Sequence, residues 1–289
     1  MRTVTFSKYQ GLGNSFLITQ RYDYLRKASQ LAKLACDKSY GIGADGMMLA
    51  LENRTEADFD YQMKLYNADG SEAEMSGNGL RCFVHYLINN GLIENPNTRI
   101  LTDAGILDAT ALNAEMLILE HEYLDLMEIK VLMGSAKIKM LTDAEPIMSS
   151  VNSFIDDVLG VWYVDIGNPH LVIYHNSTRP VNFAELYKKI GIHFKRGVNM
   201  EVVNKIANQE LNMVVYERGV GPTLACGTGS VASAVCYGIF AGVDQTITVN
   251  NPGGQLQVDF VELVRDEYLG YLTGPSQFVA TIEMSPEGI

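Results

Sequence analysis

Two glycine-rich segments of this 289-residue chain place a nucleophile-sized residue at the expected start of a helix. Residues 76–79 are Ser-Gly-Asn-Gly and residues 226–229 are Cys-Gly-Thr-Gly, and apolar helical runs follow, ending near Gly91 and Gly242. Backbone N–H groups at a helix N-terminus attract anions, and glycines let a carboxylate approach them closely. The same position stabilises a thiolate, so we expect the pKa of Cys226 to lie below its ordinary value.

A second pair of motifs has nearly the same separation. Gly13-Asn14 follows the first expected strand, and Gly167-Asn168 follows a strand over residues 161–166. Ser76 and Cys226 lie 150 residues apart, and Asn14 and Asn168 lie 154 apart. Two matches at similar offset predict two similar halves, divided near residues 120–127.

This pattern suits one kind of chemistry. Two helix starts facing one cleft would bind an α-carboxylate from both sides and stabilise the carbanion formed when the α-proton leaves. An acid/base group on each side would then invert the stereocentre without a cofactor. A single Gly-x-Gly before an apolar helix is common and often binds nothing, so only the repeated arrangement indicates a ligand site.

Composition limits the kinds of partner and the cellular location that can be expected for this protein. The formal net charge is −12, which disfavours nucleic acid and anionic membranes as partners. No apolar run is long enough to span a bilayer and no signal-like core begins the chain, so we expect a cytoplasmic protein. None of the cysteines forms a Cys-x-x-Cys pair, and we expect Cys36, Cys82 and Cys236 to be buried thiols with no metal site.

Short strands separated by turns dominate the rest of the sequence. Residues 61–65 alternate apolar and polar side chains as a half-buried strand does, and residues 67–71 have turn composition. Residues 25–35 show helical apolar spacing, and strands are expected around 214–216 and 246–249.

The chain resembles the diaminopimelate epimerase family from residue 8 to about residue 275. The shared motifs are Lys8-Tyr9-Gln10-Gly11-Leu12-Gly13-Asn14-Ser15-Phe16, Gly41-Ile42-Gly43-Ala44-Asp45-Gly46, Asn67-Ala68-Asp69-Gly70-Ser71-Glu72, Gly77-Asn78-Gly79-Leu80-Arg81-Cys82, Gly167-Asn168-Pro169-His170, Val198-Asn199, Glu217-Arg218-Gly219-Val220-Gly221, Ala225-Cys226-Gly227-Thr228-Gly229 and Pro252-Gly253-Gly254-Gln255-Leu256.

The resemblance implies an α/β (α+β) fold of two similar domains, each a mixed β-sheet wrapped around a central helix, with the active site in the interdomain cleft. The domains would be residues 1–122 plus a returning C-terminal strand, 275–289, and residues 123–274. The implied reaction interconverts LL- and meso-diaminopimelate in lysine and peptidoglycan precursor synthesis, with no pyridoxal phosphate and no metal. The partner would be a small amino-acid substrate, and a homodimer is compatible with the family.

The resemblance also assigns site residues. The catalytic set is Ser76, Cys226, His170 and Glu217, and the substrate-binding set is Asn14, Asn67, Gly77, Asn78, Asn168, Asn199, Glu217, Arg218, Gly227 and Thr228. Arg218 would pair with the distal carboxylate, and Glu217 and the asparagines would recognise the distal ammonium and nearby oxygens. The helix starts would bind the reacting carboxylate, while His170 and Glu217 would tune the thiols. We interpret His85, His121, His175 and His193 as structural.

One departure concerns catalysis. Ser76 stands where the family has its first catalytic cysteine, and a hydroxyl without a dedicated base offers no useful anion at neutral pH. Three explanations are compatible with this residue: an introduced Cys→Ser replacement, which the intact motifs favour, a natural racemase for another amino acid such as histidine, or a non-catalytic binding homologue. Gly46, where some family members have Gln, and Pro222, where Glu is frequent, leave room for altered specificity. A phenazine-pathway isomerase would share the fold but lack Cys226.

Overall fold

The structure is a computed structural model that describes residues 3–112, 124–142 and 145–286. The chain divides into two compact units, Met1–Leu132 with Thr273–Ile289, and Met133–Leu272. The boundary expected at residues 122 and 123 falls in the segment 113–123, which lies outside the described residues. Two long strands, β8 (Leu126–Met140) and β16 (Glu267–Met284), each contribute to both units.

The first unit is a mixed sheet around one helix. Its other elements are β1 (Val4–Gly11), β2 (Asn14–Thr19), the 3-10 helix η1 (Tyr22–Lys27), α1 (Ala28–Cys36), β3 (Gly46–Glu52), β4 (Tyr61–Asn67), β5 (Glu72–Ala73), α2 (Gly77–Asn89), β6 (Asn97–Thr102) and β7 (Gly105–Ala111). The strand order is β8-β7-β6-β4-β3-β2-β1-β16, with β2–β3 and β4–β6 parallel and β5 added to β4. The N–H of Phe278 donates to the carbonyl of Asp125 (2.8 Å), which brings the outer strands together.

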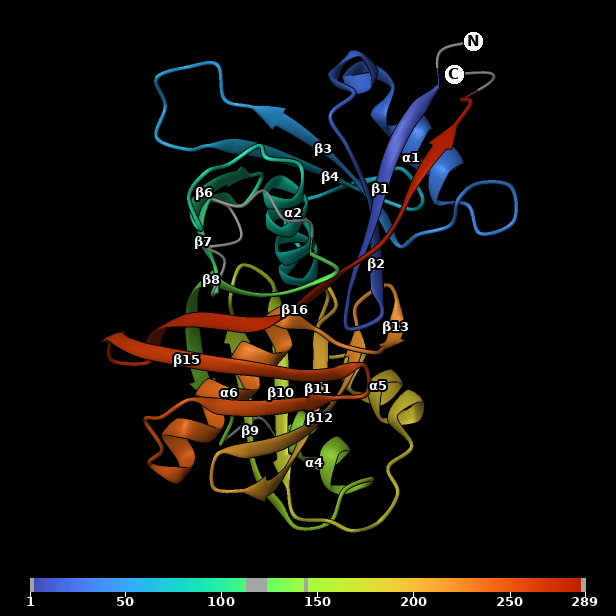
Figure 1. Cartoon of the computed structure of the whole chain (residues 1–289). Coiled ribbons are helices and arrows are strands. Elements are labelled where there is room, and N and C mark those ends of the chain that lie inside the picture. The colour runs from blue at the N-terminus through green and yellow to red at the C-terminus, as the bar shows by residue number, and fades with distance from the viewer. Residues whose placement is uncertain (1–2, 113–123, 143–144, 287–289) are drawn as a thin grey trace. The chain divides into compact units, whose positions relative to one another are not determined.

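Helix α2 fills the interior of this sheet, as Figure 1 shows. It contacts β1, β2 and β7, and its residues from Gly77 to Ile88 are all buried. A helix that is buried on every side needs little polar surface, which explains its long apolar run. Helix α1 covers the opposite face of the sheet, where Leu31 and Ala35 pack with Leu17, Met47 and Leu49.

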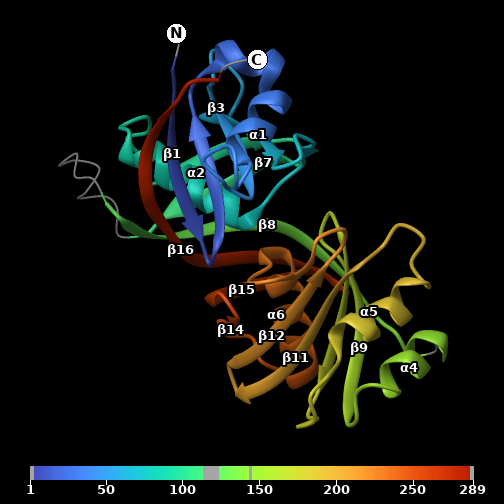
Figure 2. The same ribbon diagram turned by 90° about the vertical axis from the view of Figure 1, so that its right-hand side faces the viewer.

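The second unit has the same plan. Its other elements are α4 (Glu145–Asn152), β9 (Val158–Asp165), β10 (Pro169–His175), α5 (Phe183–Gly191), β11 (Asn199–Ala207), β12 (Glu210–Glu217), β13 (Gly221–Thr223), α6 (Gly227–Ala241), β14 (Ile247–Asn251) and β15 (Gly254–Val264). The strand order is β8-β9-β10-β11-β12-β14-β15-β16, with β10–β11 and β12–β14 parallel and β13 added to β12. Figure 2 shows β11, β12, β14 and β15 around α6.

The strands and the central helix of one unit correspond in order to those of the other. The hairpin β1–β2 corresponds to β9–β10, the strands β3 and β4 to β11 and β12, and the buried helix α2 to α6. Both hairpins turn at a glycine with positive φ, Gly13 (84°) and Gly167 (87°). The predicted fold, two similar domains each built around a central helix, is therefore confirmed.

The two central helices end close to the glycines at which the sequence predicts their ends. Helix α6 ends at Ala241, and Gly242 caps it in the left-handed conformation that glycine adopts most easily. Helix α2 ends at Asn89, just before Gly91. The helix expected over residues 25–35 is split, because η1 precedes α1, and α1 begins only at Ala28.

Candidate active site

Ser76 and Cys226 are the N-caps of the two central helices. Both have extended backbone conformations, φ −142° and ψ 122° at Ser76, and φ −126° and ψ 116° at Cys226. The Ser76 hydroxyl accepts a hydrogen bond from the N–H of Gly79 (3.1 Å), and the Cys226 sulfur accepts one from the N–H of Gly229 (3.4 Å). Side-chain acceptors at this position satisfy one of the helix's unpaired donors. The two expected helix starts therefore have the same local geometry.

Strand register explains how the second unit gathers its polar side chains. His170 of β10 is paired in register with Asn199 of β11, so both side chains are on the same face of the sheet. Because side chains alternate along a strand, Asn168 and Glu201 share that face. The neighbouring residues, such as Leu171, pack on the other face with α4 and α5. One face of two strands therefore presents a row of polar groups to the start of α6.

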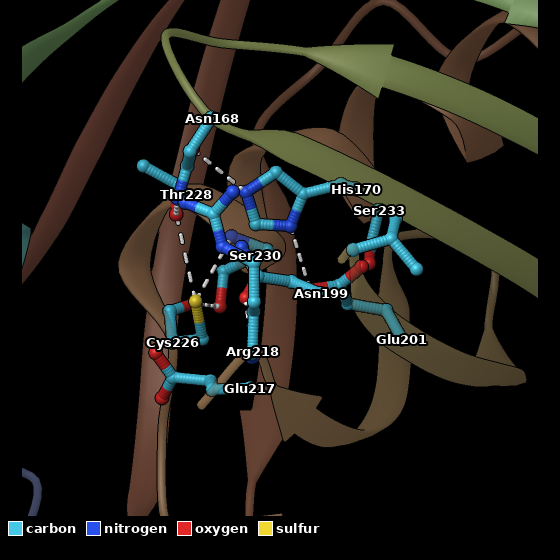
Figure 3. Close-up of polar contacts among 12 residues, drawn as sticks. Asn168, His170, Asn199, Glu201, Glu217, Arg218, Cys226, Thr228, Ser230 and Ser233 are labelled. Atoms are coloured by element: carbon cyan, nitrogen blue, oxygen red, sulfur yellow. Dashed lines mark hydrogen bonds and ion pairs between the residues drawn. The ribbon is translucent and has the colours of Figure 1, made fainter. Parts of the chain in front are cut away.

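These groups form a connected hydrogen-bond chain that reaches the Cys226 sulfur, drawn in Figure 3. His170 Nδ1 lies 2.7 Å from Glu201 Oε1, and His170 Nε2 lies 3.0 Å from Asn168 Oδ1. Asn168 Nδ2 donates to Thr228 Oγ1 (3.4 Å), and Thr228 Oγ1 lies 3.5 Å from Cys226 Sγ. The side chains of His170 and Glu201 are fully buried.

Two further polar residues of the candidate site are Glu217, at the end of β12, and Arg218, which follows it. The Glu217 carboxylate accepts a hydrogen bond from Thr223, and Asn199 Oδ1 accepts one from the N–H of Arg218 (2.9 Å). The exposed Arg218 side chain donates to the carbonyl of Arg196 (3.1 Å). Burial, together with the nearby charge of Glu201, raises the pKa of Glu217, although its hydrogen bond from Thr223 opposes the shift. Asn199, Glu217 and Arg218, which the resemblance assigned to substrate binding, therefore lie close together.

The expected pKa of Cys226 was wrong in direction. Burial raises the pKa of this thiol well above its ordinary value, and the negative charges of Glu217 and Glu201 raise it further. Hydrogen bonds from Thr228 and Gly229 lower it by less. The helix terminus does favour a thiolate, but removal from water and two carboxylates on neighbouring strands outweigh that effect. The surroundings of Cys226 therefore favour the protonated thiol over the thiolate.

The first unit holds its candidate residues differently. Asn14 Nδ2 and the N–H of Ser15 both donate to the Asp45 carboxylate, at 3.3 and 2.9 Å, and these bonds lower the pKa of Asp45 against the opposing effect of burial. Asn67 is exposed at the end of β4 and donates to Ser71 Oγ (3.0 Å). These contacts fix the orientation of the carboxamides of Asn14 and Asn67.

A buried arginine supports the start of α2. Arg81 is fully buried, and its guanidinium donates to Asn78 Oδ1 (2.7 Å), to the carbonyl of Gly77 (3.3 Å) and to the carbonyl of Pro275 (3.3 Å). Burial lowers the pKa of Arg81 to about 10. The positive charge therefore lies directly beneath the turn that the sequence assigned to carboxylate binding.

Several predicted residues are brought together and several supporting ones were missed. The structure gathers Asn168, His170, Asn199, Glu217, Arg218, Cys226, Gly227 and Thr228 in the second unit, and it holds Asn14, Asn67, Ser76, Gly77 and Asn78 in the first. Glu201 was not among the predicted site residues. Its signal was a carboxylate in the apolar run of residues 200–203, two positions after Asn199 and therefore on the same face of a strand.

Neither a metal cluster nor a membrane span is found among the residues that the structure describes. No group of three or more His, Cys, Asp or Glu side chains in residues 3–112, 124–142 and 145–286 could hold a metal ion. In the same ranges, no helix is long and apolar enough to cross a membrane.

Comparison with known proteins agrees with this geometry. The Diaminopimelate epimerase family profile matches residues 6–139 and 162–279. Diaminopimelate epimerase of Nostoc punctiforme is 36% identical, covering 96% of this chain and 98% of that protein. That of Methanothermobacter thermautotrophicus is 33% identical, covering 89% and 90%.

Solved structures share the fold at low identity. A PhzF-family phenazine biosynthesis protein of Bacillus anthracis has a TM-score of 0.75 at 16% identity, over 99% of this chain and 100% of that one. A hydroxyproline epimerase of Agrobacterium vitis has a TM-score of 0.68 at 14% identity, over 99% and 94%.

The site and the sequence matches together define an isomerase of the amino-acid epimerase and racemase class. Within that class, the chain belongs to the diaminopimelate epimerase family.

Proposed function

We propose that this chain is built to interconvert LL- and meso-diaminopimelate by two-base α-proton transfer, and that Ser76 impairs the reaction. The observation that carries the proposal is the equivalence of Ser76 and Cys226 as N-caps of the two central helices. Inversion needs one group to remove the α-proton and another to return a proton to the opposite face. We assign Cys226 to one face and residue 76 to the other.

The helix starts support recognition of the reacting carboxylate. N–H groups in the first turn of each helix have no partner within the helix, and the helix dipole adds positive potential. Stabilising charge on an α-carboxylate also stabilises the carbanion, because the two share electron density. We assign the first-turn amides of Gly77, Asn78, Gly227 and Thr228 to that carboxylate.

Groups around Arg218 support recognition of a second, distal carboxylate. Its exposed guanidinium can form two parallel hydrogen bonds with one carboxylate, which an ammonium cannot do as well. Asn199 Oδ1 already accepts a bond from the Arg218 N–H, so we assign its Nδ2 hydrogens to a substrate oxygen. Asn14 uses Nδ2 toward Asp45, so we assign its Oδ1 to a substrate ammonium.

Ser76 limits catalysis rather than binding under this proposal. A hydroxyl is too weakly acidic to supply an anion without a base, whereas its size is close to that of a thiol. Cys226 still exchanges a proton on its own face of the α-carbon. One stereoisomer should therefore exchange its α-hydrogen with solvent while inversion fails.

The test compares three proteins in heavy water: the chain as given, Ser76→Cys, and the mirror variant Ser76→Cys/Cys226→Ser. We expect Ser76→Cys to invert diaminopimelate about 10²- to 10⁴-fold faster than the chain as given. The other two proteins should incorporate deuterium into opposite isomers without inverting either. If Ser76→Cys neither exchanges nor inverts diaminopimelate, the substrate assignment is wrong, and histidine and other amino acids should be tried next.

A further inference from the structure

Glu201 occupies a place that is apolar in the equivalent unit. Phe16 and Gly46 pair in register between β2 and β3 as His170 and Asn199 do between β10 and β11. His170 therefore corresponds to Phe16. Two residues further along the second strand of each pair, Glu201 corresponds to Met48 in the first unit.

The central helices confirm that these two side chains fill the same space. A Cβ added to Gly79 would lie 2.8 Å from Met48 Cε, and one added to the equivalent Gly229 would overlap the Glu201 carboxylate. Each side chain therefore packs against the first turn of its helix, three residues after the N-cap. Only in the unit that contains Cys226 is that side chain charged.

The buried pair is costly for the fold. His170 and Glu201 are fully buried, and Glu201 Oε2 has no hydrogen-bond partner among the described residues. Removing a carboxylate from water with one oxygen unpartnered costs free energy, and apolar side chains of similar size often stabilise a protein in place of a buried ion pair. Phe16 and Met48 show that this architecture forms without the pair, so its retention calls for a role other than packing.

We propose that Glu201 is a positioning residue, which holds the His170 ring and, through Asn168 and Thr228, fixes the hydrogen bonding of the Cys226 thiol. Its role rests on the proposed function, in which Cys226 exchanges the α-proton. Within the hydrogen-bond chain from Glu201 to Cys226, the Glu201–His170 contact is the shortest at 2.7 Å, and the following contacts lengthen from 3.0 to 3.5 Å toward the sulfur. The closest contact of this hydrogen-bond chain is therefore made by the buried carboxylate.

The charges around the sulfur allow the role to be measured. Glu217 on β12 and Glu201 on β11 are the charged groups that act on Cys226 among the described residues, and His170 on β10 lies against Glu201. After burial and Glu217, Glu201 is the next cause that raises the pKa of Cys226. Removing its charge should therefore lower that pKa.

The first experiment needs no substrate. Iodoacetamide alkylation of Cys226 is followed against pH by peptide mass spectrometry in Glu201→Gln and in the control Glu210→Gln, whose carboxylate accepts from Asn250 on the adjacent strand. We expect the alkylation midpoint to move to lower pH in Glu201→Gln and to stay in place in the control. An unmoved midpoint in Glu201→Gln overturns the proposal.

Ring orientation is tested by NMR of His170. Its Nδ1 hydrogen should give a protected resonance in the unaltered protein and in Glu201→Gln, which keeps an acceptor, and should lose it in Glu201→Met. The double variant His170→Phe/Glu201→Met copies the first unit, and we expect its Tm to be unchanged or higher. A protected resonance in Glu201→Met, or a double variant that fails to fold, shows a different or purely structural role and overturns the proposal.

Activity separates this inference from the proposed function. In the Ser76→Cys background, Glu201→Met should lower kcat about tenfold or more while changing KM little, and Glu201→Gln should recover part of the loss. An unchanged kcat overturns the inference. If Ser76→Cys itself fails on diaminopimelate, the proposed function fails, while the alkylation and NMR results still decide the role of Glu201.

Discussion

Ser76 and Cys226 are equivalent residues, because each caps the central helix of its unit and accepts a hydrogen bond from the backbone N–H three residues later. What differs is the acidity of the side chain and its surroundings. The sulfur is connected to a buried histidine–carboxylate pair, whereas the first unit has Phe16 and Met48 at the corresponding positions. The site is therefore asymmetric even though the backbone repeats.

The pH dependence of Cys226 reactivity follows from its raised pKa. The thiolate is the reactive form, so reactivity should be low at neutral pH and increase as pH rises through the pKa. Glu217→Gln removes a negative charge that raises this pKa and should move the profile to lower pH. Ultraviolet thiolate absorbance, taken as the difference from Cys226→Ser, measures it, with exposed Glu262→Gln as the control. A shift to higher pH would contradict the assignment.

Arg218→Lys should separate binding from stability. The Arg218 side chain is exposed, so the free energy of unfolding should change by less than about 0.5 kcal/mol. In the Ser76→Cys background, KM for diaminopimelate should rise about tenfold with a smaller change in kcat, because a lysine loses the bidentate contact. The exposed Arg265→Lys is the matched control. Equal KM values in the two variants would remove Arg218 from the substrate site.

Substitution of alanine for Gly229 should lower the free energy of unfolding more than substitution of alanine for the equivalent Gly79. At Gly229 the new methyl group would overlap the Glu201 carboxylate, which is held by His170, and we expect a loss of about 1–3 kcal/mol. At Gly79 it would meet the flexible end of Met48, which can move, so the loss should be smaller. Urea unfolding of both variants measures the difference, and the reverse order would show that Glu201 is not held rigidly.

His85 should make stability depend on pH. Burial lowers the pKa of His85 to about 4, and its Nε2 donates to the carbonyl of Leu124 while Nδ1 accepts from Ser276. The unfolded chain therefore binds a proton at higher pH than the folded one. The contribution of neutral His85 to the free energy of unfolding is fully present above pH about 6.5. It falls by about 3 kcal/mol as the pH decreases to about 4.

Denaturant unfolding at several pH values checks the His85 prediction. His85→Gln should flatten the dependence between pH about 6.5 and about 4, whereas the exposed His193→Gln should leave it intact. Identical slopes in the two variants would assign the acid sensitivity to other groups.

Much of the fold could be predicted because its signals are local. Both central helices could be predicted from glycine-rich turns followed by apolar runs. The repeat could be predicted from the spacing of Asn14 and Asn168. The strand order could not be predicted in the same way, because pairs such as β4–β6 and β12–β14 join strands that are not consecutive in the sequence.

The electrostatics of the site depended on the same non-local pairing. The place of Cys226 at a helix start predicts a low pKa, but Glu201 and Glu217 lie near it on two strands that pair with each other, and their charges raise that pKa. The row Asn168, His170, Asn199 and Glu201 likewise exists only once β10 and β11 are in register.

The last strand has a consequence for synthesis. β16 begins in the second unit, and its C-terminal part pairs with β1, where Met284 lies opposite Val4. Translation produces β1 long before the part of β16 that pairs with it. The N-terminal unit therefore lacks this strand until the second unit, which ends at Leu272, has been synthesised.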